Sequence, residues 1–500
     1  MLSPLGARAR LFALYSDARA RALASGRGVL ATVVERAPAT DELEALETMA
    51  SSAEGLAVAG DAADRMYWRS AAGFSLAGFG AVVVLSHAGS DRFETVDRAW
   101  NAMRESAVLD DPSGGAPGAG PLLMGGFAFD PDGARTNRWR GFPPARLVIP
   151  RIQLASADGA HWLTMNLLVA PDGEADVDPA ALIALRNRLF DSAQSGGAQP
   201  ARAARPTALT YVDSRAPSSW RASVGAAVAA IRAGAIEKVV LAREVSASAP
   251  RDFDVALTLR QLRLANQASF VFGCWQGGSA FVGASPELLV GIEGSDVHAS
   301  SLAGSVSRGA TAAEDAALAA GLLASAKDRV EHEIVRRALR VGLDQLCDDI
   351  VADDQPSLLS LPQVHHLHTD VRARLRPGHS LLELVARLHP TPAVGGEPHD
   401  AALDFIRAHE QMDRGWYAGP IGWLQQTRGE FAVALRSALV TGNEALLFAG
   451  CGIVADSDPD EEYAESLLKL RPMEIALSGS VVAADAARPI PVASAGGIRQ

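Results

Sequence analysis

The chain has 500 residues, of which 48% are hydrophobic and 21% are charged, and its formal net charge is −12. This composition is typical of a globular protein with a large core, built as one large domain or two closely joined ones. The negative charge argues against nucleic acid or an anionic membrane as the main partner, and no apolar run approaches the ~20 residues of a membrane span. An anionic substrate would therefore need local basic residues to receive it.

The three cysteines, Cys274, Cys347 and Cys451, lie far apart and show no metal-ligand spacing. Such a chain has no disulfide framework and is typical of a reducing compartment. The N-terminal residues contain arginines and short apolar clusters without a cleavable signal, and we interpret them as a surface helix. The sequence therefore predicts a cytoplasmic protein.

The first half of the chain is predicted to consist mostly of β-strands. Its apolar runs between residues 28 and 170 are rich in β-branched and aromatic residues, as in VLATVVERA, FSLAGFGAVVVLS and HWLTMNLLVA. A helix is expected at 178–193, followed by a surface linker, SGGAQPARAARP. We expect a β-rich N-terminal part at 1–205, a region that carries the chemistry at 206–482, and a flexible tail at 483–500.

The second half opens with an amphipathic helix, SSWRASVGAAVAAIRAG, which has Trp220, Val224 and Val228 on one face and Gly234 as its stop. The strand AIEKVVLARE follows. Strands and helices then mix without the regular alternation of a doubly wound parallel sheet. The predicted fold class is therefore α+β, with large antiparallel β-sheets in two layers flanked by helices.

Two ionisable residues lie in or beside predicted strands. Alternation places Lys238 on the same face as Ile236 and Val240. A lysine on an apolar face loses its proton more readily, as a general base requires, and the alternative is an edge lysine whose ammonium reaches water. Glu287 follows a Ser-Pro turn between two strand runs in FVGASPELLVGIE, where it is either a general acid with a defined direction or an exposed turn residue.

The stretch SAKDRVEHEIVRRALRVGLDQL predicts a helix whose two glutamates are separated by its periodicity. Glu331 falls in line with the apolar residues Ile334 and Val335, whereas Glu333 lies on the charged face with Arg337. We expect Glu333 to form a surface salt bridge. A buried Glu331 must be paired, protonated or bound to a cation.

The C-terminal stretch AGCGIVADSDPDEEYAESLLKLRPM predicts a glycine-containing strand, a turn and a helix capped by Asp458. Glu462, Glu465 and Lys469 follow at i, i+3 and i+7 on one helical face. Such a row usually faces solvent, but the bare amides of the preceding glycines offer an anion site beside it. Together with Glu331, the two glutamates would make an all-carboxylate site suited to Mg²⁺.

Two further features concern basic side chains. The histidines His365, His366 and His368 in HHLHTD resemble a zinc pattern, but no cysteine or second histidine group joins them. Arg436 lies in a predicted strand, EFAVALRSALV, amid alternating apolar residues and without an acidic neighbour. It is either paired across the sheet or free to bind a carboxylate.

Seven motifs, in this order, resemble those of the chorismate-utilising enzymes, and most closely those of isochorismate synthases: FVGASPELLV, SLAGS, KDRVEHEIV, LHPTPAVGGEP, RGWYAGPIGW, EFAVALRSA and AGCGIVADSDPDEEYAES. They span about residues 215–480, and GGFAFDP at 125–131 is similar to the family's N-terminal signature. The resemblance implies a fold like that of anthranilate synthase component I, chorismate as substrate and Mg²⁺ as cofactor.

The resemblance also implies a role for each motif residue. Lys238 would activate a water molecule, and Glu287 would protonate the leaving hydroxyl. Glu331 and Glu465 would bind Mg²⁺ directly, and Glu462 would bind it through water. The implied substrate contacts are Gly304, Ala393, Tyr417, Arg436, Gly450, Gly452 and Lys469.

Two positions distinguish the reactions within the resembled family. Ala303 stands where aminodeoxychorismate synthases commonly carry a lysine, and Ala393 stands where ammonia-using members and salicylate synthases typically carry a threonine. Both residues favour isochorismate synthase, an isomerase. Salicylate synthase, anthranilate synthase component I and an inactive chorismate-binding subunit are the alternatives. We expect a monomer or homodimer without a glutamine amidotransferase subunit, and the long N-terminal half favours a role in menaquinone rather than siderophore synthesis.

Overall fold

The computed structural model describes residues 4–59, 64–133, 135–194 and 207–479. The linker expected near 195–206 and the tail expected at 483–500 lie outside these residues. The helices are α1 (Pro4–Ser25), α2 (Glu42–Ser51), α3 (Ala53–Ala59), α4 (Arg92–Ser106), η1 (Asn137–Trp139), α5 (Pro179–Gln194), α6 (Pro217–Arg232), α7 (Val255–Ala265), α8 (Ala312–Ala324), α9 (Ala326–Asp344), α10 (Leu381–Leu388), α11 (His399–His409) and α12 (Pro459–Ser478).

The strands are β1 (Val29–Arg36), β2 (Arg65–Arg69), β3 (Ser75–His87), β4 (Val108–Asp110), β5 (Leu123–Phe127), β6 (Ala145–Ala157), β7 (Ala160–Val169), β8 (Thr210–Asp213), β9 (Lys238–Ser248), β10 (Phe270–Gln276), β11 (Ser279–Ser285), β12 (Leu288–Glu293), β13 (Asp296–Ser307), β14 (Cys347–Ala352), β15 (Ser357–Ser360), β16 (Val364–Leu375), β17 (Gly396–Glu397), β18 (Pro420–Leu424), β19 (Arg428–Val433), β20 (Ser437–Thr441) and β21 (Glu444–Ile453). The α+β class with large antiparallel sheets is confirmed.

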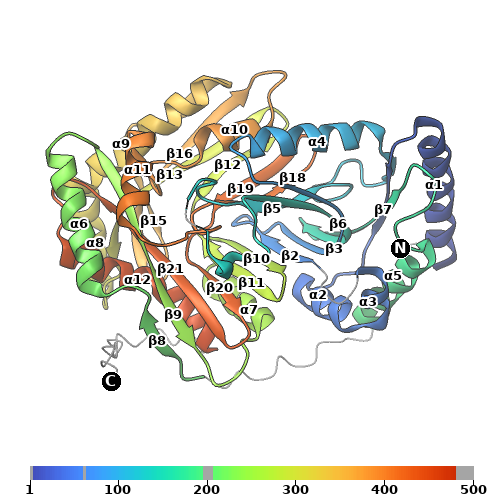
Figure 1. Cartoon of the computed structure of the whole chain (residues 1–500), viewed down its shortest axis with the longest axis horizontal. Coiled ribbons are helices and arrows are strands. Elements are labelled where there is room, and N and C mark those ends of the chain that lie inside the picture. The colour runs from blue at the N-terminus through green and yellow to red at the C-terminus, as the bar shows by residue number, and fades with distance from the viewer. Residues whose placement is uncertain (1–3, 60–63, 134, 195–206, 480–500) are drawn as a thin grey trace.

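The strands form one sheet that branches at β6 (Figure 1). A first arm continues from β6 through β3, β2, β10, β11, β20 and β21 to β9. A second arm continues through β5, β18, β19, β12 and β13 to β16. The strands β7 and β1 also extend from β6, and β4 joins β1 in the one parallel pairing among the described strands.

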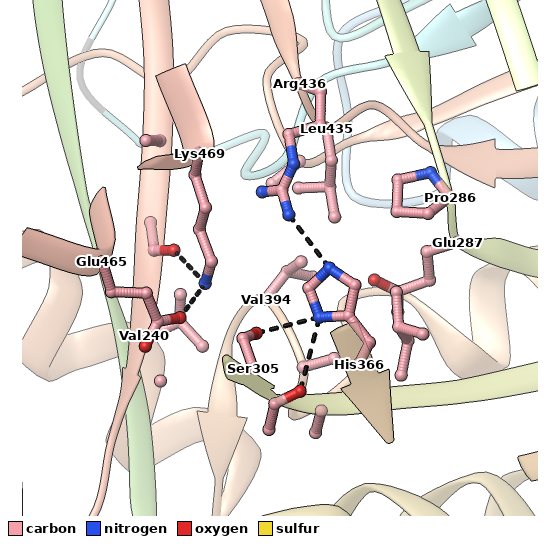
Figure 2. Close-up of a pocket in the computed structure, with 18 of the residues that line it drawn as sticks. Val240, Pro286, Glu287, Ser305, His366, Val394, Leu435, Arg436, Glu465 and Lys469 are labelled. Carbon is pink, nitrogen blue, oxygen red and sulfur yellow. Dashed lines mark hydrogen bonds and ion pairs between the residues drawn. The ribbon is translucent and has the colours of Figure 1, made fainter. Parts of the chain in front are cut away.

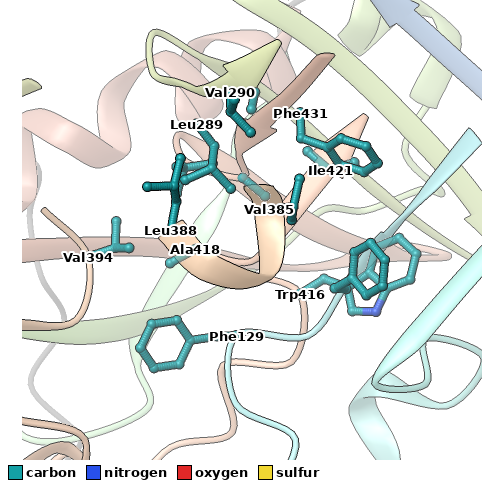
Figure 3. Close-up of a cluster of buried hydrophobic side chains, with 14 of the residues drawn as sticks. Phe129, Leu289, Val290, Val385, Leu388, Val394, Trp416, Ala418, Ile421 and Phe431 are labelled. Carbon is teal, nitrogen blue, oxygen red and sulfur yellow. The ribbon is translucent and has the colours of Figure 1, made fainter. Parts of the chain in front are cut away.

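The core lies in two parts, one on each face of the first arm. The first cluster includes Phe281 of β11 and Trp416, just before β18, which contact each other between the two arms. It continues to the outer face of the second arm, where Phe431 of β19 lies with Val385 of α10 (Figure 3). On the opposite face of the first arm, Leu470 of α12 belongs to a second cluster, shared with residues of α1, α2, α5 and α7. The two arms therefore face each other across an apolar layer, and helices cover their outer faces.

The prediction of a mostly β first half is wrong for residues 42–59 and 92–106, which form α2, α3 and α4. In α4 the buried residues Phe93, Val96 and Trp100 recur at helical spacing, a period of 3.6 rather than 2. The N-terminal helix α1 has one face buried, with Leu11 fully enclosed, while the opposite face is exposed. No described helix is long and apolar enough to cross a membrane.

Candidate active site

A cavity lies between the two arms, near the end of the sheet that carries β9 (Figure 2). Strands β9 and β21 of the first arm form one wall, and β13 and β16 of the second arm form the other. The helices α9 and α12 contribute the remaining charged side chains. All the site residues predicted from the sequence line this cavity except Lys238, whose side chain lies directly behind Glu331.

Lys238 is fully buried, so the alternative of an edge lysine that reaches water is wrong. Its strand, β9, is interior because β21 and β17 pair with it. The Lys238 Nζ atom lies 2.9 Å from Glu331 Oε1, on the neighbouring helix α9. The structure therefore places a lysine without solvent contact beside a carboxylate at the edge of the cavity.

Glu287 is buried at the junction between β11 and β12, and the alternative of an exposed turn residue is also wrong. Its backbone is fixed because its carbonyl accepts a hydrogen bond from Val433 N at 3.1 Å. Burial raises the pKa of the Glu287 carboxyl to about 8, although Lys238 and Arg436 act to lower it. Glu287 is therefore protonated at neutral pH, and its unpartnered Oε1 atom is suited to donating a proton.

The prediction for the two glutamates of α9 is confirmed. Glu331 is buried, whereas Glu333 is exposed and pairs with Arg336 through a 2.7 Å contact. The helix begins at Ser325, whose hydroxyl caps it by accepting a hydrogen bond from Asp328 N. The 3.6-residue period of α9 thus turns one glutamate toward the cavity and its neighbour toward water.

Each of the three predicted metal-binding glutamates forms an ion pair with a lysine. The nitrogen–oxygen distances are 2.9 Å for Glu331 with Lys238, 3.1 Å for Glu462 with Lys327, and 2.6 Å for Glu465 with Lys469. Glu462 is 3% exposed, so the solvated helical face considered from the sequence is wrong. Burial and the nearby Glu465 carboxylate raise the pKa of Glu462, while Lys327 opposes this effect. The carboxylates are therefore close enough to repel one another.

The carboxylates of Glu462 and Glu465 fit a divalent cation. Ligand atoms of Glu462, Glu465 and Cys451 lie within 4.8 Å of one another, whereas Glu331 is outside this group and is held by Lys238. The carboxylate oxygens are ligands that Mg²⁺ prefers, and a cation would relieve the repulsion between Glu462 and Glu465. The Cys451 thiol instead donates to the Glu462 carbonyl at 3.2 Å.

Arg436 differs from its prediction because it lies in the turn between β19 and β20, not in a strand. Its φ of 47° is left-handed, and Figure 2 shows its guanidinium directed at His366. The Arg436 Nη2 atom donates to His366 Nε2 at 3.1 Å, and Arg436 has no acidic partner among the described residues. Burial lowers the pKa of Arg436 from its ordinary value. An anionic ligand would supply the missing carboxylate.

His366 is a pocket residue that the sequence interpretation missed. Burial, with the charges of Arg436 and Lys469, holds the pKa of His366 well below its ordinary value, so the ring is neutral. Its Nδ1 atom lies 2.9 Å from Ser305 Oγ. The alternation of β16 was the available signal, because it turns the adjacent His365 to the opposite face, where that residue contacts Ser360 and Asp315.

The glycines of β21 leave room for charged side chains. A Cβ atom on Gly452 would lie 2.2 Å from Glu331 Oε1 and 2.9 Å from Lys238 Cε. A Cβ atom on Gly450 would lie 3.1 Å from Tyr417 Oη, and the Gly450 carbonyl accepts a hydrogen bond from Lys469. Both glycines pair with β9 in the sheet. The structure shows that these glycines allow other side chains to approach the strand closely. That their backbone amides bind an anion stays a prediction from the sequence.

The remaining predicted contacts complete the walls of the cavity. Gly304 is an extra residue in β13, at φ 79°, where the register against β16 shifts. Ala393 lies in the loop before β17, and Tyr417 comes just before β18. Burial raises the pKa of the Tyr417 phenol to about 12. Tyr417 is therefore a neutral hydroxyl at neutral pH.

A buried ion pair holds the Ala393 loop against the strand that begins with Lys238. Arg414 contacts Glu410 at 2.6 Å and donates to the carbonyls of Val394 at 2.8 Å and Val240 at 2.9 Å. Arg414 is the first residue of the motif RGWYAGPIGW, but neither Arg414 nor Glu410 was assigned a role from the sequence. Only their burial identifies them as part of the framework of the site.

The comparisons with known proteins agree with this geometry. The family model for chorismate binding enzymes matches residues 17–478. The chain belongs to the chorismate-binding enzyme family. Among family relatives, it is 42% identical over 405 residues to the salicylate biosynthesis isochorismate synthase of Pseudomonas aeruginosa, covering 80% of this chain and 82% of that protein. It is 36% identical over 404 residues to the isochorismate synthase MenF of Bacillus subtilis, covering 80% and 84%.

Solved structures show that this chain has the family's fold. The menaquinone-specific isochorismate synthase of Escherichia coli aligns with a TM-score of 0.70 at 24% identity, covering 93% of this chain and 99% of that chain. Anthranilate synthase component I from Streptococcus pneumoniae aligns with a TM-score of 0.60 at 21% identity, covering 80% and 92%. The fold implied by the sequence motifs is thus confirmed.

Proposed function

We propose that this chorismate-binding enzyme is an isochorismate synthase, an isomerase that converts chorismate to isochorismate. Relatives of that name align over four-fifths of the chain. The single observation that carries the proposal is that one cavity is lined by the protonated Glu287 and by Glu331, the partner of the buried Lys238. An acid and a base held in one site are what the removal of one hydroxyl and the addition of another require.

Different residues of the chain bind the substrate and transfer the two protons. Arg436 and Lys469 receive the carboxylates of chorismate, since both line the cavity, Arg436 as a buried cation and Lys469 as a half-buried one. Lys238 takes a proton from the water that adds at carbon 2. Glu287 gives a proton to the hydroxyl that leaves carbon 4, so one water enters and one leaves. The substrate and product are therefore isomers.

We further propose that Mg²⁺ is the cofactor. Glu331 and Glu465 would hold it directly, and Glu462 would hold it through water. When bound, Mg²⁺ supplies charge neutralisation at the ring carboxylate of the substrate. The fit of Glu462 and Glu465 to a cation supports this assignment, and Glu331 lines the same cavity. With a cation as its partner, Glu331 would no longer depend on Lys238, which leaves Lys238 able to lose its proton.

The lining of the cavity supports water as the nucleophile. Ala303 and Ala393 both line it, and neither offers a nucleophilic or hydrogen-bonding side chain. Ammonia supplied by a glutamine amidotransferase subunit is therefore not part of the proposal. The name of the Pseudomonas aeruginosa relative refers to salicylate biosynthesis, and that of the Escherichia coli structure refers to menaquinone. Either use of isochorismate is compatible with the proposal.

Product analysis tests the proposed function. Purified protein with chorismate and Mg²⁺, but without ammonia or glutamine, is expected to yield isochorismate by chromatography, and chelation of Mg²⁺ should stop the reaction. Lys238→Ala should lower turnover by about 10²–10⁴-fold, the usual contribution of a positioned proton-transfer group. Anthranilate as the main product when ammonia is added would contradict the assignment. Salicylate with pyruvate would identify a salicylate synthase instead.

A further inference from the structure

A buried histidine follows Glu331 directly in α9. His332 is 2% exposed, and its Nε2 atom lies 2.8 Å from the Thr369 hydroxyl of β16. Its Nδ1 atom has no hydrogen-bond partner among the described residues, although the ring lies close to the backbone of Ala303 in β13. The ring therefore lies between one helix and two strands.

The elements that meet at His332 each carry part of the site. Helix α9 carries Glu331, one residue before His332. Ala303 is followed by the extra residue Gly304, which lines the cavity and changes the register of β13 against β16. Thr369 lies in β16, the strand that also carries His366. His332 is thus located where the helix of the proposed metal site packs on the strands of the proposed substrate site.

One ring nitrogen holds the ring in this location. The Nε2 atom forms a hydrogen bond with the Thr369 hydroxyl, and it accepts that bond when the ring proton is on Nδ1. An apolar side chain of similar size would fill the space but would not make this interaction. The helix would then be held at this point by packing alone. Packing restricts the rotation of α9 and its position along its axis less strictly than a directional hydrogen bond does.

We propose that His332 is a positioning residue that ties α9 to β16 through Thr369 and thereby sets the place of the Glu331 carboxylate relative to Gly304. The inference rests on the proposed metal site. Mg²⁺ requires near-ideal octahedral geometry with ligand distances of about 2.0–2.1 Å, so a small shift of one ligand-bearing helix has a large effect on its affinity. His332 itself is not among the residues that line the cavity.

Direct titration of the protein with Mg²⁺ by calorimetry tests this role without relying on turnover. His332→Leu is expected to weaken Mg²⁺ binding by about 10–100-fold, the usual effect of losing a supporting interaction around a metal site. His332→Gln, whose amide can reach Thr369, should recover part of that loss. Thr369→Val should show an intermediate loss, and it leaves the histidine in place if the leucine variant does not fold.

Thr32→Val is the matched control. Thr32 is fully buried in β1, and its hydroxyl donates to Asn166 at 2.7 Å, so this variant also removes one buried hydrogen bond. It should lower the melting temperature to a similar degree as Thr369→Val while leaving Mg²⁺ affinity unchanged. Steady-state kinetics should show the same division, with a higher half-saturating Mg²⁺ concentration only for the His332 and Thr369 variants.

Three outcomes would overturn the inference. Normal Mg²⁺ affinity in both His332→Leu and Thr369→Val, with lower melting temperatures, would show that His332 acts only in packing. If Thr32→Val weakened Mg²⁺ binding to the same extent, the loss of affinity would be a consequence of lower overall stability and not of the lost His332 contact. Failure of the unaltered protein to bind Mg²⁺ would remove the proposed metal site and this inference with it, a result distinguishable from normal binding in every variant.

Discussion

At the scale of single residues, Glu287 shows how burial determines a chemical role. A carboxyl group on the surface is ionised at neutral pH and cannot act as an acid. At the β11–β12 junction, burial outweighs the attraction of Lys238 and Arg436 and raises the pKa of Glu287 to about 8. The same cavity is therefore lined by one carboxylic acid, Glu287, and by several carboxylates. Their protonation states differ because their surroundings differ.

This difference predicts a pH dependence. The proposed role of Glu287 requires its protonated form, which is lost as the pH rises through about 8. We expect kcat/KM to fall on the alkaline side of that value and Glu287→Gln to be about 10²–10⁴-fold less active, without that alkaline limb. A pH–rate profile of both proteins is the measurement. An unchanged alkaline limb in Glu287→Gln would assign the titration to another group.

A second residue-scale prediction concerns the two glycines of β21. Gly452→Ala would place a methyl group 2.2 Å from Glu331 Oε1 and should displace Glu331 and Lys238, with activity reduced by at least about 10²-fold because both groups are misplaced. Gly450→Ala meets Tyr417 Oη at 3.1 Å, which a small movement of the phenol relieves. Turnover and Mg²⁺ affinity of the two variants should therefore differ strongly. Equal effects would contradict this account of the strand.

At the scale of elements, the site depends on which face two helices present. Helix α9 turns Glu331 inward, and α12 presents Glu462 and Glu465 from its first two turns. Asp458 caps α12 by accepting hydrogen bonds from the amides of residues 460 and 461, as its sequence predicts. The cap fixes where the helix starts and thus where the two carboxylates lie.

Matched substitutions on α9 test this arrangement. Glu331→Gln keeps the side-chain volume but removes a charge, so we expect the half-saturating Mg²⁺ concentration to rise by about 10-fold or more while the fold persists. Glu333→Gln removes the same charge from the exposed face and should change Mg²⁺ affinity little, because surface ion pairs contribute little. Titration of Mg²⁺ in both variants is the measurement. The reverse result would mean that the helix faces are assigned wrongly.

At the scale of the whole molecule, the two predicted parts of the chain share one sheet. Strand β2 pairs with β10, and β5 pairs with β18, so hydrogen bonds cross between the first and second halves. The Trp68 indole also donates to Glu430 at 2.8 Å across this junction. Neither half can form its part of the sheet without leaving strand edges and apolar side chains uncovered.

We therefore expect the protein to unfold as a single cooperative unit. Calorimetry should show one thermal transition, and a fragment beginning at residue 207 should fail to fold because β10 and β18 lose their partners. Fluorescence and circular dichroism should report the same midpoint. Two separated transitions, or a soluble, cooperatively folded fragment, would show that the halves are independent domains.

Much of the fold and part of the site follow from local patterns. Content of β-branched and aromatic residues predicts β1, β3 and β7, and the helical period assigns Glu331 to the buried face of α9. The same reasoning missed α4, because its charged residues masked a helical stripe in a region rich in strands. The order of the seven motifs indicates the family, since each motif is a short segment that remains recognisable without its surroundings.

The sequence by itself determined which residues carry charge and, in α9, which faces Glu331 and Glu333 occupy. Only the tertiary structure decided their partners. Glu462 pairs with a lysine 135 positions away, and Arg436 contacts a histidine 70 positions away, through the packing of helices and the register of the sheet. A local period fixes the direction of a side chain within its own element, because it depends on backbone geometry alone. The distance between two elements depends on the free energy of packing the whole core, and so does every pKa that burial shifts.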